Sequence, residues 1–266
     1  MANTRDFNGK WALVTGASAG IGIALARELA KHGAKIVLTA RRKERMEALA
    51  AELAAKGTEV RIVPADLNDP AAPQQIYDAT AGAGLPIEIL INNAGLGQYG
   101  AFAESPIDQE LSQIRVNCEG MVHLARLFVP AMVARKRGWV MVLASTASFQ
   151  PVPYLNTYAA TKAFDRFFAL GLAAEVAPHG VKVTALCPGP TESEFFEVAR
   201  SENFMPGGRQ SAEEVARLGV EALARGKRTI VPYAAGAFVA GLVRFLPTSL
   251  ITTQIEKRAR PKSQRS

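Results

Sequence analysis

The chain has 266 residues, of which 48% are hydrophobic, so it can bury a large core, and an α/β sheet of this length commonly forms one domain. The formal net charge is +7, but residues 252–266 hold five basic side chains against one acidic side chain, which places +4 in this tail and +3 in the body. No aromatic residues alternate with a basic stripe in the body. This pattern argues against a nucleic-acid partner.

The cysteines and histidines indicate neither a disulfide framework nor a metal site. Cys118 and Cys187 lie in apolar surroundings without CxxC spacing, and the three histidines are scattered. The first ten residues lack the apolar core of a signal peptide. We therefore expect a reducing, cytoplasmic setting and no metal.

The first predicted strand, Trp11–Thr15, runs into the glycine-rich stretch TGASAGIG. Apolar residues then recur at helical spacing until a glycine offers a C-terminal stop, at Ile21, Leu25, Leu29 and Gly33. Gly16, Gly20 and Gly22 would let the backbone approach a pyrophosphate, which the free N–H groups of the helix start favour. The spacing is GxxxGxG, and the same turn would also serve as a βα connection without a ligand.

The second predicted strand, Ile36–Thr39, is followed by Ala40, Arg41 and Arg42. In a dinucleotide-binding fold this strand end meets the adenosine ribose, where enzymes that prefer NAD usually place a carboxylate. Ala40 supplies none, and a guanidinium matches the geometry of a phosphate. The pattern favours NADP, although RRKER is also compatible with a solvated helix start.

Polar residues follow the next two predicted strands, Val60–Val63 and Ile87–Ile91. Ligands in open α/β sheets bind outside the carboxyl ends of the strands. The candidate ligand residues at these two ends are Asp66, Leu67, Asn93, Ala94 and Gly95, the last three within the sequence NNAG.

A long helix is predicted over Ile107–Arg135, with Asn117 in its middle, where asparagine is a mediocre helix former. If Asn117 has no functional role, it is expected to be an exposed amide on the helix surface. The strand predicted at Trp139–Ala144 is followed by Ser145, and a helix is predicted from Thr157 onward.

Tyr158 and Lys162 are four residues apart in that helix, so they share one face. An adjacent ammonium favours the phenolate and would lower the pKa of a phenol from about 10 by roughly 1 to 3 units. Tyr158 would then serve as an acid and base, with Ser145 bonding a substrate oxygen from the opposite side. Taken alone, a tyrosine and a lysine at this spacing are more often ordinary surface and packing residues.

The last predicted elements are a strand at Val181–Leu186, a helix from Ser211 to Ala224 and a seventh strand at Thr229–Tyr233. Strands and helices alternate throughout, which predicts a single α/β, Rossmann-like, doubly wound domain over residues 1–233, with a seven-stranded parallel sheet flanked by helices. Residues 234–266 are expected to form an apolar helical extension with a basic tail.

The ordered set TGASAGIG, Asp66, NNAG, Asn117, Ser145, YAATK (158–162) and CPGPT (187–191) resembles the short-chain dehydrogenase/reductase family over about the first 195 residues. The resemblance implies a Rossmann-like fold with NAD(P) bound across the strand ends. It implies a catalytic tetrad of Asn117, Ser145, Tyr158 and Lys162. Tyr158 would be the acid and base, Ser145 would hold the reacting oxygen, Lys162 would bind the nicotinamide ribose, and Asn117 would hold a water.

The resemblance also implies a set of cofactor-binding residues. Their expected partners are the pyrophosphate, the adenine and the nicotinamide carboxamide, and the full set is Gly16, Ser18, Gly20, Ile21, Gly22, Arg41, Arg42, Asp66, Leu67, Asn93, Ala94, Gly95, Tyr158, Lys162, Pro188, Gly189 and Thr191. The TGAS and ARR pieces resemble the NADP-preferring branch. Ala19 departs from the family, since many relatives carry a polar residue there.

We therefore expect an NADP(H)-dependent oxidoreductase that interconverts a carbonyl and an alcohol. The alternative is a non-catalytic NADP-binding sensor or partner-docking protein of the same fold. The candidate pocket lining is Gly97 to Tyr99, Phe149 to Leu155 and Glu192 to Gly208, the last contributing Phe195, Phe196, Phe204 and Met205. Aromatic and thioether side chains favour an apolar substrate, although they also suit core packing.

The apolar segment Gly236 to Ile251 precedes the basic tail and is interrupted by Arg244 and Pro247, so a membrane span is not expected. Phe238, Leu242 and Phe245 recur at helical spacing and predict a short helix with one apolar face. That face would cover the substrate pocket, contact another subunit or lie on an anionic membrane; pocket cover or a subunit contact is preferred. The family resemblance implies a homodimer or homotetramer through the helices around Asn117 and Tyr158.

Overall fold

The computed structural model describes residues 4–192, 194 and 209–261. Its centre is a seven-stranded parallel sheet with the strand order β3-β2-β1-β4-β5-β6-β7. The strands are β1 (Trp11–Thr15), β2 (Lys35–Thr39), β3 (Val60–Ile62), β4 (Ile87–Asn92), β5 (Gly138–Leu143), β6 (Val181–Leu186) and β7 (Thr229–Ile230). The predicted fold class is confirmed. The chain builds outward from β1 to β3 and then crosses back to β4 on the other side of β1, so the switch point at which ligands bind in such sheets lies between β1 and β4.

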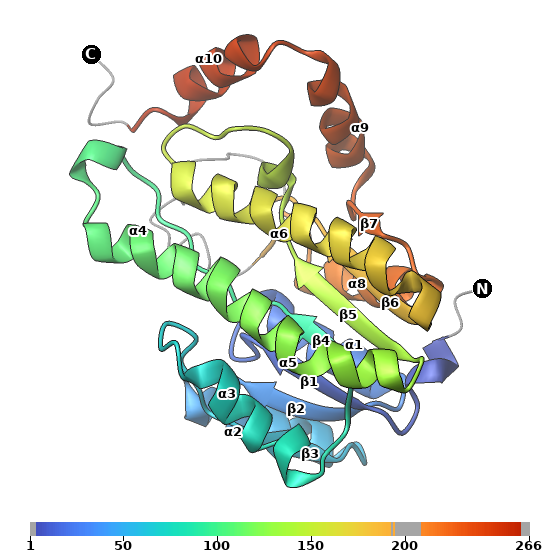
Figure 1. Ribbon diagram of the computed structural model, residues 1–266. Helices are drawn as coiled ribbons and strands as arrows, with labels where there is room; N and C mark the ends of the chain where they lie inside the picture. Colours follow the sequence, from blue (N-terminus) through green and yellow to red (C-terminus); the bar gives the residue numbers. More distant parts are fainter. Residues whose placement is uncertain (1–3, 193, 195–208, 262–266) are drawn as a thin grey trace.

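Every residue of β1 and β4 is buried, because helices cover both faces of the sheet. On one face α1 (Gly20–Lys31) and α8 (Ala212–Arg225) pack on the sheet through residues such as Leu25, Leu29 and Leu223. On the other face lie α3 (Ala72–Asp78), α5 (Gly120–Ala134) and α6 (Asn156–Val176). Figure 1 shows α5 and α6 in front of the sheet. The helix α2 (Lys43–Ala54) joins β2 to β3.

The predicted helix over Ile107–Arg135 is not one continuous α-helix. It consists of α4 (Ile107–Ile114), a π-helical turn at Arg115–Glu119, and α5. Asn117 lies inside the π turn and is only 1% exposed, so the interpretation as an exposed amide was wrong. Single π turns inside α-helices frequently occur at functional sites.

The seventh strand is shorter than predicted and ends at Ile230, since Pro232 has no N–H to donate to a further pairing. The predicted helix start at Ser211 holds as a cap, because its side chain accepts a hydrogen bond of 3.1 Å from the N–H of Glu214 and α8 begins at the next residue.

The C-terminal segment forms two helices rather than one, α9 (Ala234–Leu242) and α10 (Thr248–Ala259), separated by a 3₁₀ turn at Val243–Phe245 and by Pro247. Figure 1 shows them as an arch at the top of the molecule, above α6, whose first turn contains Tyr158. The predicted apolar face does not cover the pocket, because Phe238, Leu242 and Phe245 are 71%, 45% and 85% exposed. Among the described residues, no helix is both long enough and apolar enough to cross a membrane.

Candidate active site

The glycine-rich loop lies between β1 and α1, where its backbone is packed too closely for side chains. Gly16 has a φ of +65°, and a Cβ there would lie 2.9 Å from the Cα of Ala94. A Cβ at Gly22 would collide with the carbonyl oxygen of Gly16. No side chain caps the start of α1. The Gly22 N–H donates to the Ala19 carbonyl at 3.2 Å, and a ligand or water can bind the other N–H groups of the first turn. This bare, close-packed helix start fits a pyrophosphate.

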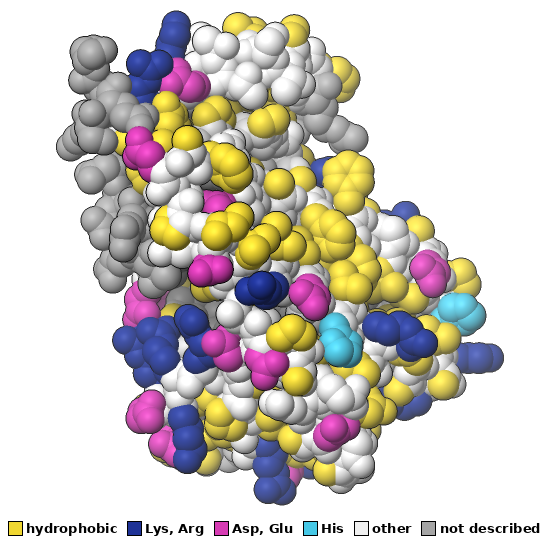
Figure 2. Space-filling view, turned by 60° about the vertical axis from the view of Figure 1, so that its left-hand side comes forward, with side chains coloured by type: hydrophobic (Ala, Val, Ile, Leu, Met, Phe, Trp, Pro, Cys, Tyr) yellow, Lys and Arg dark blue, Asp and Glu magenta, His cyan; other side chains and the backbone are white. Residues whose placement is uncertain are grey.

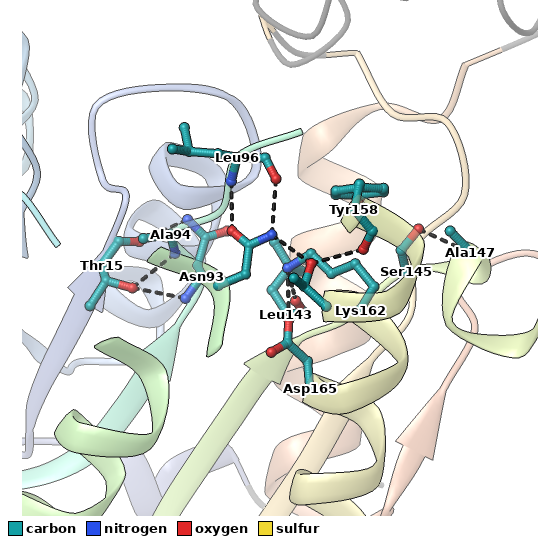
Figure 3. A network of polar contacts seen from close by, with 12 residues as sticks. Thr15, Asn93, Ala94, Leu96, Leu143, Ser145, Ala147, Tyr158, Lys162 and Asp165 are labelled. Carbon is teal, nitrogen blue, oxygen red and sulfur yellow. Dashed lines mark hydrogen bonds and ion pairs between the residues drawn. The ribbon is translucent and has the colours of Figure 1, made fainter. Parts of the chain in front are cut away.

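Thr15 and Asn93 join the ends of the two central strands. The Thr15 hydroxyl accepts hydrogen bonds of 2.9 Å from the N–H groups of both Asn93 and Ala94, and Asn93 Nδ2 donates to the Thr15 carbonyl at 2.8 Å (Figure 3). The side chain of Asn93 therefore positions the loop after β4 against the glycine-rich loop. Sequence reasoning missed Thr15, whose only signal was a hydroxyl at the end of β1.

Arg42, rather than Arg41, reaches the glycine-rich loop. Its Nε donates to the Ser18 hydroxyl at 3.3 Å, and its Nη1 lies 2.7 Å from a carboxylate oxygen of Glu194. Arg45 pairs with the same carboxylate. Hydrogen bonds from Arg42 and Arg45 hold the pKa of Glu194 below its usual value. Arg41 is exposed beside this group, so both arginines remain predicted phosphate ligands, with Arg42 the better placed.

Asp66 and Leu67 follow β3, and each makes a local contact. Asp66 Oδ1 accepts a hydrogen bond of 3.0 Å from the N–H of Asn68 and so shapes the turn. Leu67 packs against the core cluster under α5. Their predicted contact with adenine stays a prediction.

Asn117 holds the loop after β4 to α6. Its Nδ2 donates to the Leu96 carbonyl at 2.9 Å and to the Thr161 hydroxyl at 2.8 Å, and its Oδ1 accepts from the Leu96 N–H at 2.8 Å. The Thr161 hydroxyl in turn donates to the Tyr158 carbonyl at 2.8 Å. Asn117 thus positions the backbone beside Tyr158, while its expected role as a water ligand stays a prediction.

Ser145, Tyr158 and Lys162 come together at the carboxyl end of β5. Ser145 begins a 3₁₀ turn, Thr146–Phe149, and its Oγ accepts from the Ala147 N–H at 3.1 Å. Lys162 is 3% exposed and donates to the Leu143 carbonyl at 2.7 Å, and its Nζ lies 5.9 Å from the centre of the Tyr158 ring. The helical spacing therefore brings the ammonium beside the phenol, as the sequence predicted.

The pKa of Tyr158 is raised rather than lowered in the protein alone. Burial is the largest cause, and it outweighs the Lys162 charge and a hydrogen bond with Ser145, both of which lower the pKa. The Asp165 charge adds to the rise. The expected effect of Lys162 is present, but desolvation of the phenolate is larger.

Asp165 is a second group that sequence reasoning missed. Its Oδ2 lies 2.9 Å from Lys162 Nζ, and the residue is 1% exposed (Figure 3). The signal was readable, because Asp165 is three residues after Lys162 and falls on the same helical face.

The loop after β6 lies next to the turn that follows Ser145. The Pro188 carbonyl accepts a hydrogen bond of 2.9 Å from the Thr146 N–H, which ties this loop to the turn after Ser145. Thr191 is 3% exposed, and its hydroxyl donates to the Gly189 carbonyl at 3.0 Å. A Cβ at Gly189 would collide with the ring of Tyr233. Pro188, Gly189 and Thr191 remain predicted cofactor residues.

Tyr99 and Tyr154, which belong to the predicted substrate lining, both contact α10. The Tyr99 hydroxyl donates to the Ala259 carbonyl at 2.6 Å, and the Tyr154 hydroxyl donates to Glu256 Oε1 at 3.0 Å. Ile255 packs against the same small apolar cluster as Tyr158, made of Val152, Leu155 and Ala159. The predicted lining residues Phe195, Phe196, Phe204 and Met205 lie outside the described residues.

Neither cysteine has the low thiol pKa that a nucleophile or a metal ligand needs. Burial raises the pKa of Cys118 to about 12 and that of Cys187 to about 11, so both stay protonated near neutral pH. Within the described ranges no cluster of three metal-ligating side chains occurs.

Comparisons with known proteins cover both the sequence and the fold. The sequence pattern of the family described as short chain dehydrogenase matches residues 10–203. The chain is 33% identical over 232 residues to a very-long-chain 3-oxoacyl-CoA reductase of Podospora anserina, covering 85% of this chain and 68% of the relative. It is 38% identical over 208 residues to a serine 3-dehydrogenase of Rhizobium radiobacter, covering 76% of this chain and 78% of the relative.

Among solved structures, a short-chain dehydrogenase from Sphingobium yanoikuyae in complex with NADPH matches with a TM-score of 0.81 and 30% identity, covering 90% of this chain and 96% of that chain. The family pattern spans the glycine-rich loop and all four predicted catalytic residues. It ends before α8, so α9 and α10 lie beyond it.

Proposed function

Because this chain belongs to the short chain dehydrogenase family, we propose that it is an NADP(H)-dependent oxidoreductase that interconverts a carbonyl and an alcohol on an apolar substrate. One observation carries the proposal. Tyr158 and the buried ammonium of Lys162 lie together beside Ser145, at the sheet edge where the glycine-rich loop begins α1. Such a constellation of an acid, a cation and a hydroxyl beside a dinucleotide-type loop suits hydride transfer coupled to proton transfer.

The residues divide the work by their chemistry. When bound, the cofactor would supply the hydride to a carbonyl carbon or accept it from an alcohol. Tyr158 gives its proton to the substrate oxygen in reduction and takes it back in oxidation, while Ser145 bonds the same oxygen. Burial raises the pKa of Tyr158 and keeps the phenol protonated, which is the form that reduction needs. Lys162 is held by Leu143 and Asp165 so that its charge stays beside the phenol.

Preference for NADP(H) is supported by the end of β2. Ala40 offers no carboxylate to a ribose hydroxyl, whereas Arg42 already contacts Ser18 of the glycine-rich loop. A phosphate would compete with Glu194 for the Arg42 guanidinium. The solved relative from Sphingobium yanoikuyae, which holds NADPH, adds to this support.

An apolar substrate is supported by the wall of the site. Val152 and Leu155 are buried beside Tyr158, and Ile255 of α10 packs on the same cluster. We place α10 as a cover over this part of the site, held by the hydroxyls of Tyr99 and Tyr154. The very-long-chain 3-oxoacyl-CoA reductase relative acts, by its name, on an acyl substrate, in keeping with an apolar chain.

A second copy of the chain is the proposed partner for the outer face of α4 and α6. Figure 2 shows hydrophobic side chains gathered across the middle of this face. Ile107 and Ile114 on α4 are 64% and 45% exposed, and Phe167 on α6 is 69% exposed. A contiguous apolar face of this kind suits a subunit contact through the helices that carry Tyr158 and precede Asn117.

The experiment is a screen of ketones, aldehydes and secondary alcohols followed by the absorbance of the reduced nicotinamide, with Tyr158→Phe as the decisive variant. The variant should keep NADPH binding and lose turnover by about 100-fold or more, because it removes only the proton donor. A Tyr158→Phe variant with nearly unchanged kcat on a confirmed substrate would contradict the proposal. NADPH binding without turnover on any compound would favour the sensor or docking alternative.

A further inference from the structure

Asp165 is a buried carboxylate that the proposed reaction does not use. It is 1% exposed within α6, and its Oδ2 lies 2.9 Å from Lys162 Nζ. Its second oxygen, Oδ1, is buried and has no hydrogen-bond partner in the part of the chain that the structure describes. A carboxylate in such surroundings is costly to desolvate, and a half-satisfied one especially so.

The fold does not need this charge. The buried stripe of α6 continues with Ala169, Ala173 and Val176, so an apolar residue at position 165 would continue the packing. Hydrophobic residues in place of both members of a buried ion pair often give equal stability, so the pair as a whole is not needed for packing. What the carboxylate changes is the neighbourhood of Lys162, which lies one turn earlier on the same face.

We infer that Asp165 is a positioning residue that holds the Lys162 ammonium in place beside Tyr158 and, as its counter-charge, sets the pH range in which the site works as a proton donor. The inference rests on the proposed function and names a residue that the catalytic tetrad does not contain. Two separate effects follow from the geometry.

The first effect is orientation. An ammonium has three N–H donors, and within the described residues Leu143 and Asp165 take two of them, at 2.7 Å and 2.9 Å. These two acceptors come from different elements, the end of β5 and α6. They fix Nζ between them and leave the remaining donor for a ligand hydroxyl.

The second effect is electrostatic and involves every titratable group packed around the pair. The groups that face it are Tyr158 on α6, Cys118 in the π turn and Cys187 after β6, with the Arg166 guanidinium lying over the Phe149 ring at 4.2 Å. Both thiols stay protonated, and the Arg166 charge acts on Cys187, so the charges that act on Tyr158 are those of Lys162 and Asp165. Burial alone would lower the pKa of Lys162, and Asp165 is the largest influence that raises it.

The sign of the pH effect follows from charge balance. Burial raises the pKa of the Asp165 carboxyl, and the charge and hydrogen bond of Lys162 oppose that rise. At a pH above this pKa, Asp165 is a carboxylate, and loss of a proton from the Tyr158–Lys162 pair adds negative charge beside it. Without Asp165, that proton is lost more easily, whether it leaves the phenol or the ammonium. Carbonyl reduction needs both groups protonated, so its rate should fall at a lower pH.

The test uses Asp165→Asn in the full-length protein, which keeps the side-chain shape and removes the charge. The alkaline fall of kcat/KM for carbonyl reduction should move to lower pH by about one unit, the size expected for a charge a few ångströms away. Glu175→Gln is the matched control, since it removes an exposed carboxylate from the same helix and should leave the profile unchanged.

A second readout needs neither cofactor nor turnover. Phenolate absorbance is titrated in the protein alone, and the Tyr158 contribution is taken as the difference from Tyr158→Phe, which is practical because the chain has five tyrosines. Asp165→Asn should change the pH at which this contribution appears, and Glu175→Gln should not. This readout stands even if no turnover is found, which separates failure of the inference from failure of the proposed function.

The variant Asp165→Leu tests whether the effect of Asp165 is electrostatic or purely structural. Both variants leave the buried Lys162 ammonium without its counter-charge, so the midpoint of thermal unfolding should fall in both. Asp165→Leu should show the same acid displacement of the reduction profile as Asp165→Asn. Unchanged profiles and an unchanged phenolate titration in both variants would overturn the inference. Loss of thermal stability with unchanged pH dependence would overturn it as well, because Asp165 would then be structural only.

Discussion

The two sides of the site are held together in different ways. On the cofactor side, the glycine-rich loop lies against the backbone after β4, and Thr15 and Asn93, which join the two, are themselves buried. On the substrate side, α10 is attached through two tyrosine hydroxyls and one small apolar cluster, while Phe238 and Phe245 before it remain exposed. The first side tolerates no added atom, whereas the second tolerates change.

The largest effect should come from adding one carbon to the glycine-rich loop. In Gly22→Ala the new Cβ would collide with the Gly16 carbonyl and lie 2.6 Å from Asn93 Nδ2, so the loop must open. The affinity for NADPH, measured by fluorescence titration, should fall by at least about 100-fold. The loss would arise from geometry, since no charge is altered.

Gly171→Ala in α6 is the control for that loss, because a Cβ there meets nothing within 4 Å. It should leave NADPH affinity unchanged and add about 0.5 to 1 kcal/mol to the free energy of unfolding. Equal NADPH affinities for Gly22→Ala and Gly171→Ala would break the contrast between the two sides.

An intermediate effect is expected from the arginines after β2. Arg42→Ala should reduce the preference for NADPH over NADH by about ten- to hundredfold, since a charge-assisted bond to phosphate contributes about 1.5 to 3 kcal/mol. Arg41→Ala should have the smaller effect, because Arg42 is the arginine that contacts Ser18. Dissociation constants for both cofactors measure this. Equal constants in the unmutated protein would refute the assignment to NADP.

The smallest effect belongs to the substrate side. Tyr154→Phe removes the hydrogen bond to Glu256 that ties α10 to the loop before α6, so KM should rise modestly with NADPH affinity unchanged. Tyr77→Phe, on α3 and packed against Phe128, should change neither constant.

Truncation after Pro232 removes the whole cover and should raise KM further. Salt-sensitive binding of the full-length protein to anionic vesicles, lost on truncation, would instead assign the exposed face of α9 to a membrane surface. A change in subunit mass on truncation would assign that face to a second copy.

The strand pattern was sufficient to predict the sheet. Continuous apolar runs such as Ile87 to Ile91 occur where both sheet faces are covered, and the Tyr158–Lys162 spacing correctly placed the two side chains together. These features depend on residues close in sequence. The pairing of Thr15 with Asn93 joins residues 78 apart, and a lone threonine carries no sign of such a partner.

Three other features were missed for different reasons. No amino-acid pattern distinguishes the π turn at Asn117 from an α-helix. The helical spacing of apolar residues therefore predicts one continuous helix. Asp165 was readable from its spacing to Lys162 but was passed over within an otherwise apolar helix. The spacing of Phe238, Leu242 and Phe245 indicates an apolar helical face but does not say what that face contacts. The structure leaves these side chains exposed, and the cover that we propose for the site is α10.

The π turn also rotates α4 and α5 relative to each other about the helix axis, so their side chains do not continue in one helical register. Each α-helical residue turns the chain by about 100°, so a one-residue deletion between Arg115 and Glu119 would restore a continuous α-helix and rotate α4 against α5 by roughly that angle. Either Leu124 and Phe128 would leave the core, or the outward row of Ile107 and Ile114 would swing toward it. The extra residue therefore lets one stretch of chain serve two surfaces whose orientations no single helix could satisfy, and Asn117 reaches Leu96 from the point where they diverge.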